Sequence, residues 1–233
     1  MRRCRFALIA LLAVACIDDI PENLMRLQAA EARLRAIPGN AQSLDFILGK
    51  LNDHRRITRN NAAAILRLLA GDPKVRAAIA PRAVPALIEV AGRHNDNQQE
   101  GMMALGEFRE YGAPAVPLLI RRLSDDERTV TEALGMIGPA SAPAIPLLRK
   151  NLRSDDMQMR ILTAVAIRRI APDDREAIDN LIELLHGRDR EARLSAISAL
   201  QDLGPLALPA LPALEADKDA ENAVRTIKHP ERR

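Results

Sequence analysis

A sixteen-residue block that occurs four times constrains this chain more than any other feature of its sequence. The blocks begin at Ala104, Ala133, Ala166 and Ala199, so successive copies lie 29, 33 and 33 residues apart. Each block starts with Ala and an aliphatic residue and ends with Leu. A block that returns at this spacing is typical of stacked repeats, in which each unit packs mainly on its neighbours. The sequence therefore predicts a repeat array.

Small and helix-ending residues divide each block into the end of one helix and the start of another. Ala-Leu-Gly closes a first helix, and Gly and Pro follow it, as they often do just past a helix end. We expect second helices to open at Pro114, Pro143 and Pro209, because proline is tolerated where the N–H has no intrahelical partner. Each of these prolines is followed by another three residues later. Such a spacing also occurs in polyproline ligands, but the apolar run behind it favours a helix.

The composition indicates an all-α fold. Hydrophobic residues make up 48% of the chain, but aromatic residues make up only 2%, and there is no Trp. Alanine and leucine must therefore fill the core. No run alternates β-branched with polar residues, which is the pattern of a half-buried strand.

The block Ala133–Leu148 resembles the HEAT-like repeats of the bilin lyase type, whose consensus reads A-L-G-x-I-G followed by A-I-P-x-L. The first unit, Asn61–Ala91, is more similar to an armadillo repeat, with an extra short helix started by Asp72-Pro73. The resemblance implies an α-solenoid of HEAT/armadillo-like repeats over residues 59–229. Repeats of this kind serve many functions, so the resemblance does not carry lyase activity to this chain.

The N-terminus has the order of a secretory signal. Three arginines precede an apolar run that is too short to span a bilayer, and Ala13-Val14-Ala15 fits the small-x-small cleavage rule. The same segment resembles a bacterial lipobox, which implies a signal peptide over residues 1–15 and a lipid on Cys16. Two alternatives stay open. Cys16 can be simply the first residue of a soluble secreted protein, or the run can be a buried helix of a cytosolic one.

The residues after the cleavage site favour the outer membrane or the periplasmic side of the cell envelope. Bacterial lipoproteins held at the inner membrane tend to have Asp directly after the lipid-bearing Cys, whereas this chain has Ile17. We expect residues 16–58 to form a tether and two capping helices, at 22–36 and about 41–51. The array follows, and residues 230–233 form a basic tail.

The charge gives no case for nucleic-acid binding. The chain has 34 basic and 31 acidic residues, for a formal net charge of +3. Three of the basic residues, Arg2, Arg3 and Arg5, lie in the predicted signal peptide. The mature chain would therefore be neutral, which removes the electrostatic argument for a polyanion.

No catalytic, metal or cofactor motif is present in the sequence. The four histidines are far apart, and the mature chain would have one cysteine, so neither a zinc pattern nor a His-Glu pair can be formed from neighbouring residues. The sequence therefore predicts a non-catalytic scaffold that binds another protein. The alternatives are a lyase-like enzyme or enzyme subunit, and a cytosolic adaptor.

The loops between units carry helix starts. Ser124-Asp125-Asp126-Glu127 reads as a capping box with Ser124 at the cap. The acidic pairs at 155–156 and 173–174 read as variants of it, rather than as calcium or acid/base sites. Leu123 and Ala133 are ten residues apart, whereas the corresponding pairs in the next two units are fourteen apart. This spacing predicts a helix near 127–136 that is one turn shorter than its neighbours.

A row of basic residues is the candidate partner-binding site. Second helices often line the concave face of stacked repeats, and that face is the common binding surface. We expect an acidic segment of a partner protein to bind basic residues near the ends of two second helices: Arg121, Arg122, Arg149, Lys150 and Arg153. The alternative is that these cations pair locally, for instance with Asp125, Asp126 or Glu127.

Overall fold

The structure is a computed structural model that describes residues 20–93, 98–187 and 189–230. The described residues form helices and turns, with no strand among them, which confirms the predicted all-α fold. The predicted signal peptide, Cys16 and residues 231–233 lie outside the described residues.

The helices alternate between two rows. The first-helix row consists of α1 (Ile20–Ala36), α3 (Arg56–Ala70), α5 (Gln98–Glu107), α7 (Glu127–Ile137), α9 (Met157–Ile170), α11 (Arg190–Leu203) and α13 (Glu221–Lys228). The second-helix row consists of α2 (Ala41–Lys50), α4 (Pro73–Gly92), α6 (Val116–Arg122), α8 (Ile145–Leu148), α10 (Arg175–His186) and α12 (Leu211–Glu215). Four 3-10 helices lie between them: η1 (Arg109–Ala115), η2 (Pro139–Ala144), η3 (Arg149–Arg153) and η4 (Gly204–Ala210).

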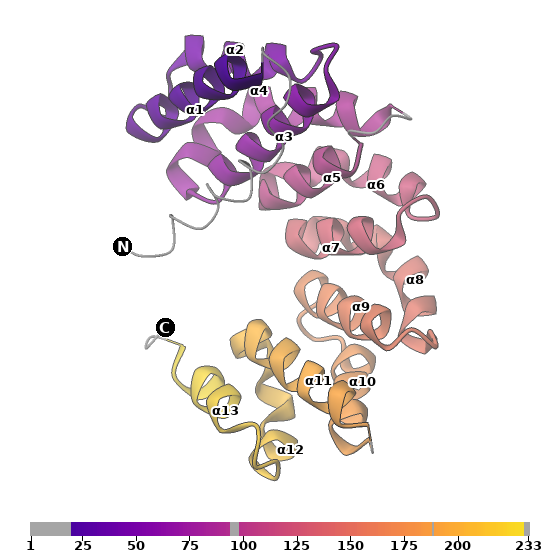
Figure 1. Ribbon diagram of the computed structural model, residues 1–233. Coiled ribbons are helices and arrows are strands. Elements are labelled where there is room, and N and C mark those ends of the chain that lie inside the picture. Colours follow the sequence, from indigo (N-terminus) through magenta and orange to yellow (C-terminus); the bar gives the residue numbers. More distant parts are fainter. Residues whose placement is uncertain (1–19, 94–97, 188, 231–233) are drawn as a thin grey trace.

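The two rows form an arc with the first helices on its inner side (Figure 1). Each helix of the first row packs against the next one of that row, from α1 to α13. Helices α6, α8 and α10 lie on the outer side of the arc. The expectation that second helices line the concave face is therefore wrong.

Glycines on the inner row explain the direction of the curve. A Cβ atom built on Gly106 would lie 2.9 Å from Cα of Ala133, and one on Gly135 would lie 2.8 Å from Cα of Ala166. These separations are shorter than a carbon–carbon contact allows, so the close packing of α5, α7 and α9 requires glycine. The inner helices approach more closely than larger side chains would permit, and the array bends toward them.

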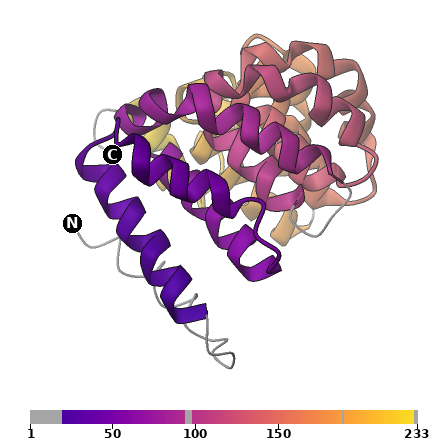
Figure 2. The same cartoon turned by 90° about the horizontal axis from the view of Figure 1, so that it is seen from above.

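The N-terminal helix pair covers one end of the stack. Helix α1 packs on α2 and α3, and α2 also contacts α4, so the pair continues both rows (Figure 2). The side chains of Leu27 and Leu34 on α1, and of Ile47 on α2, are fully buried. The first pair of helices therefore shares the hydrophobic core of the array.

Helix α4 runs for 20 residues without a break, so the extra short helix expected from Asp72-Pro73 does not form. Asp72 does cap the helix, by accepting hydrogen bonds from the amides of Lys74 and Val75, and Pro73 is its first residue. Pro81 and Pro85 lie inside the helix on its exposed face. Each proline removes one backbone hydrogen bond, and the freed carbonyl can bond to water instead.

The prolines of the repeat blocks lie in 3-10 turns rather than at the starts of α-helices. Pro114, Pro143 and Pro209 fall within η1, η2 and η4, and each α-helix begins two residues later. The second proline of each pair then occupies the first turn of the α-helix, where it is tolerated. The expected helix starts were thus early by two residues, because the first proline falls in a tighter turn.

Aspartates, not Ser124, cap the helices of the array. The Asp126 side chain accepts from the amide of Thr129, so the expected capping box is shifted by two residues. Asp156 and Asp174 cap α9 and α10 in the same way. Helix α7 has 11 residues, whereas α9 and α11 have 14 each, which confirms the shorter helix that the spacing predicts.

One continuous helical run, Arg190–Glu215, is long and apolar enough to cross a membrane by length and composition alone. Of the most apolar 18-residue stretch of this run, 44% is buried inside the array, where α11 packs on α9 and α13. Core helices of soluble proteins pass the same test, so the run is weak evidence for a span.

Candidate functional site

The predicted basic row lies on the outer side of the arc, at the ends of α6 and η3 (Figure 1). Arg122 is only 6% exposed. Its Nη1 donates to Asp125 at 2.9 Å, and its Nη2 donates to the carbonyl oxygen of Gly92 at 2.6 Å. Arg122 therefore joins the end of α4 to the end of α6, and its guanidinium is not open to a partner.

Arg149 connects two consecutive units. Its guanidinium bonds to the carboxylates of Asp174 and Glu176, at the start of α10. Burial acts to lower the pKa of Arg149, but these two carboxylates outweigh it and raise the pKa above the ordinary value. Because Asp174 also caps α10, this cation has a structural role between η3 and the next helix.

The other three cations of the row are accessible. Arg121, Lys150 and Arg153 are exposed, and none of them forms an ion pair with the described residues. Two of the five predicted residues, Arg122 and Arg149, thus bond to other parts of the array, and the other three form no ion pair with the described residues. Partner binding by these three stays a prediction.

A groove of about 270 Å³ lies on the inner face, between α7, α9 and α11. Its floor is apolar and is formed by Ile161, Leu162 and Val165 of α9. Charged side chains rim it: Arg128, Glu132, Arg169 and Asp202.

Arg169 is the central cation of this inner groove. It is partly buried, and its guanidinium makes no hydrogen bond or ion pair with the described residues. Burial, followed by the neighbouring guanidinium of Arg109, lowers the pKa of Arg169. Three carboxylates oppose this effect: Asp202, Glu132 and Glu107. A partly buried guanidinium that forms no ion pair with the described residues can donate hydrogen bonds to a carboxylate of another molecule.

Arg109 has an unusual backbone conformation beside the groove. Its φ is +54°, and it is the only non-glycine residue with positive φ in the described part of the chain. The matching positions of two other blocks are Gly138 and Gly204, which also have positive φ. Arginine in this region costs about 1 kcal/mol relative to glycine. Arg109 is thus an exposed cation at a block position where two of the other three blocks have glycine.

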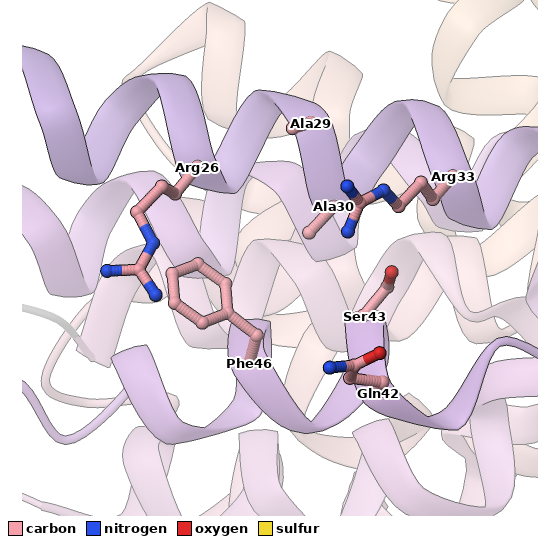
Figure 3. A pocket seen from close by; sticks show the side chains of 7 residues that line it. All are labelled: Arg26, Ala29, Ala30, Arg33, Gln42, Ser43 and Phe46. Carbon is pink, nitrogen blue, oxygen red and sulfur yellow. The ribbon is translucent and has the colours of Figure 1, made fainter.

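A second hollow, of about 240 Å³, lies between α1 and α2 at the N-terminal end (Figure 3). Arg26 and Arg33 extend from α1 on either side of Ala29 and Ala30, whose small side chains leave the space open. The facing residues belong to α2: Gln42, Ser43 and Phe46. Sequence reasoning missed this hollow, because it treated the two helices only as a cap.

No group of three or more His, Cys, Asp or Glu side chains that could hold a metal ion occurs within residues 20–93, 98–187 and 189–230. Sequence reasoning also missed the inner groove, although one signal was present. In the third and fourth blocks, Arg169 and Asp202 occupy the block position of Glu107 and Met136. A block position that is charged in three of the four units marks a surface row rather than a core row.

Comparison with known proteins supports the fold. The chain is similar to the complex of CpcE and CpcF of phycocyanin lyase from Nostoc sp. PCC7120, with 21% identity over 95% of this chain and 91% of that one, and a TM-score of 0.57. It is also similar to the archaeal HEAT-like repeats protein from Thermococcus onnurineus NA1, with 13% identity over 92% and 97% of the two chains, and a TM-score of 0.53. Comparison with family models and with curated proteins gives no match. The protein is an all-α solenoid whose structural neighbours include HEAT-like repeat proteins.

Proposed function

We propose that this protein is a non-catalytic scaffold that binds a partner protein in the groove of its inner face. The observation that carries the proposal is Arg169, a partly buried cation that forms no ion pair within the described part of the chain and lies beside apolar groove residues. A partner segment with one carboxylate and an adjacent apolar side chain would satisfy both features. Binding hot spots commonly combine a buried apolar contact with a desolvated arginine.

The exposed cations Arg121, Lys150 and Arg153 are a second candidate surface for the same kind of partner. Because they lie on the outer side of the arc, a partner cannot use both surfaces through one short segment. The two sites can therefore be separated by mutation.

The experiment compares the unchanged full chain with two variants. Each of the three proteins is used to capture a cross-linked partner from native membranes. The inner variant carries Arg169→Gln with Leu162→Ser, and the outer variant carries Arg121→Gln, Lys150→Gln and Arg153→Gln. We expect the inner variant to lose capture by about tenfold or more, since hydrogen bonds to charged groups contribute about 1.5–3 kcal/mol. The outer variant should retain it. Loss only in the outer variant would move the site there, and equal capture by all three would reject both surfaces.

We also propose that the chain is secreted and anchored through a lipid on Cys16. The support is the order of charged start, apolar run and small-x-small-Cys motif in residues 1–16. An anchored scaffold would hold its partner at the membrane surface.

A lyase-like enzyme or enzyme subunit is a second candidate, and the similarity to the phycocyanin lyase complex favours it. In that case the carboxylates of the inner groove, Glu132 and Asp202, would take part in the reaction. An enzyme would lose turnover but keep its ligand in Glu132→Gln and Asp202→Asn variants. A scaffold has no turnover to lose.

A further inference from the structure

The hollow between α1 and α2 is rich in positive charge (Figure 3). Arg33 forms no ion pair with the described residues. Arg26 pairs with Glu22 at 3.7 Å, but both side chains are more than half exposed, so this bond is weak. The guanidinium carbon of Arg26 lies 5.0 Å from the centre of the Phe46 ring, and this cation–π contact directs Arg26 across the hollow.

The opposite wall supplies neutral donors. Ser43 is 4% exposed, and its hydroxyl has no hydrogen-bond partner among the described residues although it faces the hollow. Gln42 precedes it in the first turn of α2. Asn40 caps this helix by accepting from the amide of Ser43 at 2.8 Å, which fixes the first turn of α2 beside the hollow. The Ser43 hydroxyl is therefore a donor that opens onto the hollow and can bond to a ligand there.

The spacing of the donors selects the kind of anion. Arg26 and Arg33 are seven residues apart, which is two turns or about 10.5 Å along one helix face. A carboxylate offers two acceptor oxygens in one plane, whereas a phosphate ester offers three in different directions and so fits guanidinium groups that approach from two sides. The volume of about 240 Å³ leaves room beside a phosphate for the carbon group that it esterifies. We infer that this hollow binds the phosphate group of a phosphate ester.

Two sources could supply such a group, a soluble phosphate ester or the headgroup of an anionic lipid. The lipid source rests on the anchoring proposed above, whereas the phosphate site itself does not. Ile20, the first residue of α1, is four positions after Cys16. This stretch can span at most about 14 Å, so an anchored chain would place α1 close to the headgroups.

The test uses the full chain with Cys16→Ser, so that no attached lipid brings the protein to a membrane. One arm titrates glycerol 3-phosphate by calorimetry, with glycerol as the ligand control. The other arm measures sedimentation with vesicles of phosphatidylglycerol mixed with phosphatidylcholine, and with vesicles of phosphatidylcholine alone. Each arm compares the starting protein with Arg33→Gln, Ser43→Ala and Arg35→Gln.

Arg35→Gln is the matched control. Arg35 lies on the same helix and is exposed, but it bonds to Glu31 at 2.8 Å and does not line the hollow. Both arginine variants remove one charge, so a non-specific effect of charge would weaken binding equally. Circular dichroism melts establish that each variant is folded.

We expect Arg33→Gln to weaken binding about tenfold or more, Ser43→Ala to weaken it several-fold, and Arg35→Gln to change it less than twofold. This pattern with glycerol 3-phosphate identifies a soluble ester, and the same pattern only with phosphatidylglycerol vesicles identifies a lipid headgroup. Absence of binding in both arms, or equal losses in Arg33→Gln and Arg35→Gln, would overturn the inference. Neither result bears on the inner groove, which is tested with other variants.

Discussion

At the scale of single residues, the third position of each repeat block determines how closely two units pack. Gly106 and Gly135 hold this position in the first two blocks and lie against the backbone of the next unit. The third block has Arg168 there, which is 4% exposed and donates from Nη1 to the carbonyl oxygen of Asp174 at 3.2 Å. Burial lowers the pKa of Arg168, against the opposing effect of Asp173 and Asp174. The same position thus serves close contact in two units and a buried hydrogen-bonded cation in the next.

Substitution by alanine should have opposite effects on stability at two glycines. Gly135→Ala should lower the free energy of unfolding by about 1–3 kcal/mol, because the new methyl group would overlap the backbone of Ala166. Gly49→Ala should raise it by up to about 1 kcal/mol, because Gly49 is helical and has no atom within 4 Å of an added Cβ. The measurement is urea unfolding followed by circular dichroism. A gain of stability in both variants would contradict the close approach of α7 to α9 at Gly135.

At the scale of the elements, the five array helices α4, α7, α9, α10 and α11 start at a side chain that accepts hydrogen bonds from their unpaired amides, whereas α3, α6, α8, α12 and α13 have no such cap among the described residues. Five helices have aspartate at the cap, which also places a negative charge at the positive end of the helix dipole: Asp72, Asp126, Asp156, Asp174 and Asp189. Helix α7 is the shortest of these five helices, so one lost cap hydrogen bond is a larger share of its backbone hydrogen bonds. We therefore expect it to be the most sensitive of the five.

A paired substitution identifies the cap of α7. Asp126→Ala should reduce stability by about 1 kcal/mol, because the amide of Thr129 loses its acceptor. Ser124→Ala should change stability by less than about 0.5 kcal/mol, since Ser124 makes only an exposed 3.4 Å contact with Asp125. Thermal and urea unfolding of both variants would check this. A larger loss for Ser124→Ala would restore the capping box that begins at Ser124.

At the scale of the whole molecule, the arc leaves two surfaces with different chemistry. The inner face has a groove lined by apolar residues and by charges of both signs, whereas the exposed cations of the outer side include Arg121, Lys150 and Arg153. The hollow between α1 and α2 lies at the N-terminal end, away from both surfaces. A chain anchored at its N-terminus would therefore keep its inner groove free for a partner.

Fractionation tests the anchor. In the native host, the protein should sediment with membranes and carry a mass increase from the lipid on its first residue, Cys16. The Cys16→Ser variant should lose the lipid and appear either uncleaved or in the soluble fraction. A soluble native protein cut before an unmodified Cys16 would show simple secretion. An intact Met1 without lipid would show that the chain is cytosolic.

The sequence by itself determined the repeat array, because the block spacing and the Gly and Pro positions are local signals of helix ends. The same local counting predicted that α7 is shorter than α9 and α11. Only the tertiary structure decided which row faces inward, since that follows from contacts such as Gly135 on Ala166, 31 residues apart. It also decided how the cations are paired: Arg122 is buried and donates to a carbonyl oxygen 30 residues away, whereas Arg169 forms no ion pair with any residue that the structure describes. Charge can be read along a chain, but burial and pairing depend on residues that the fold brings together from different units.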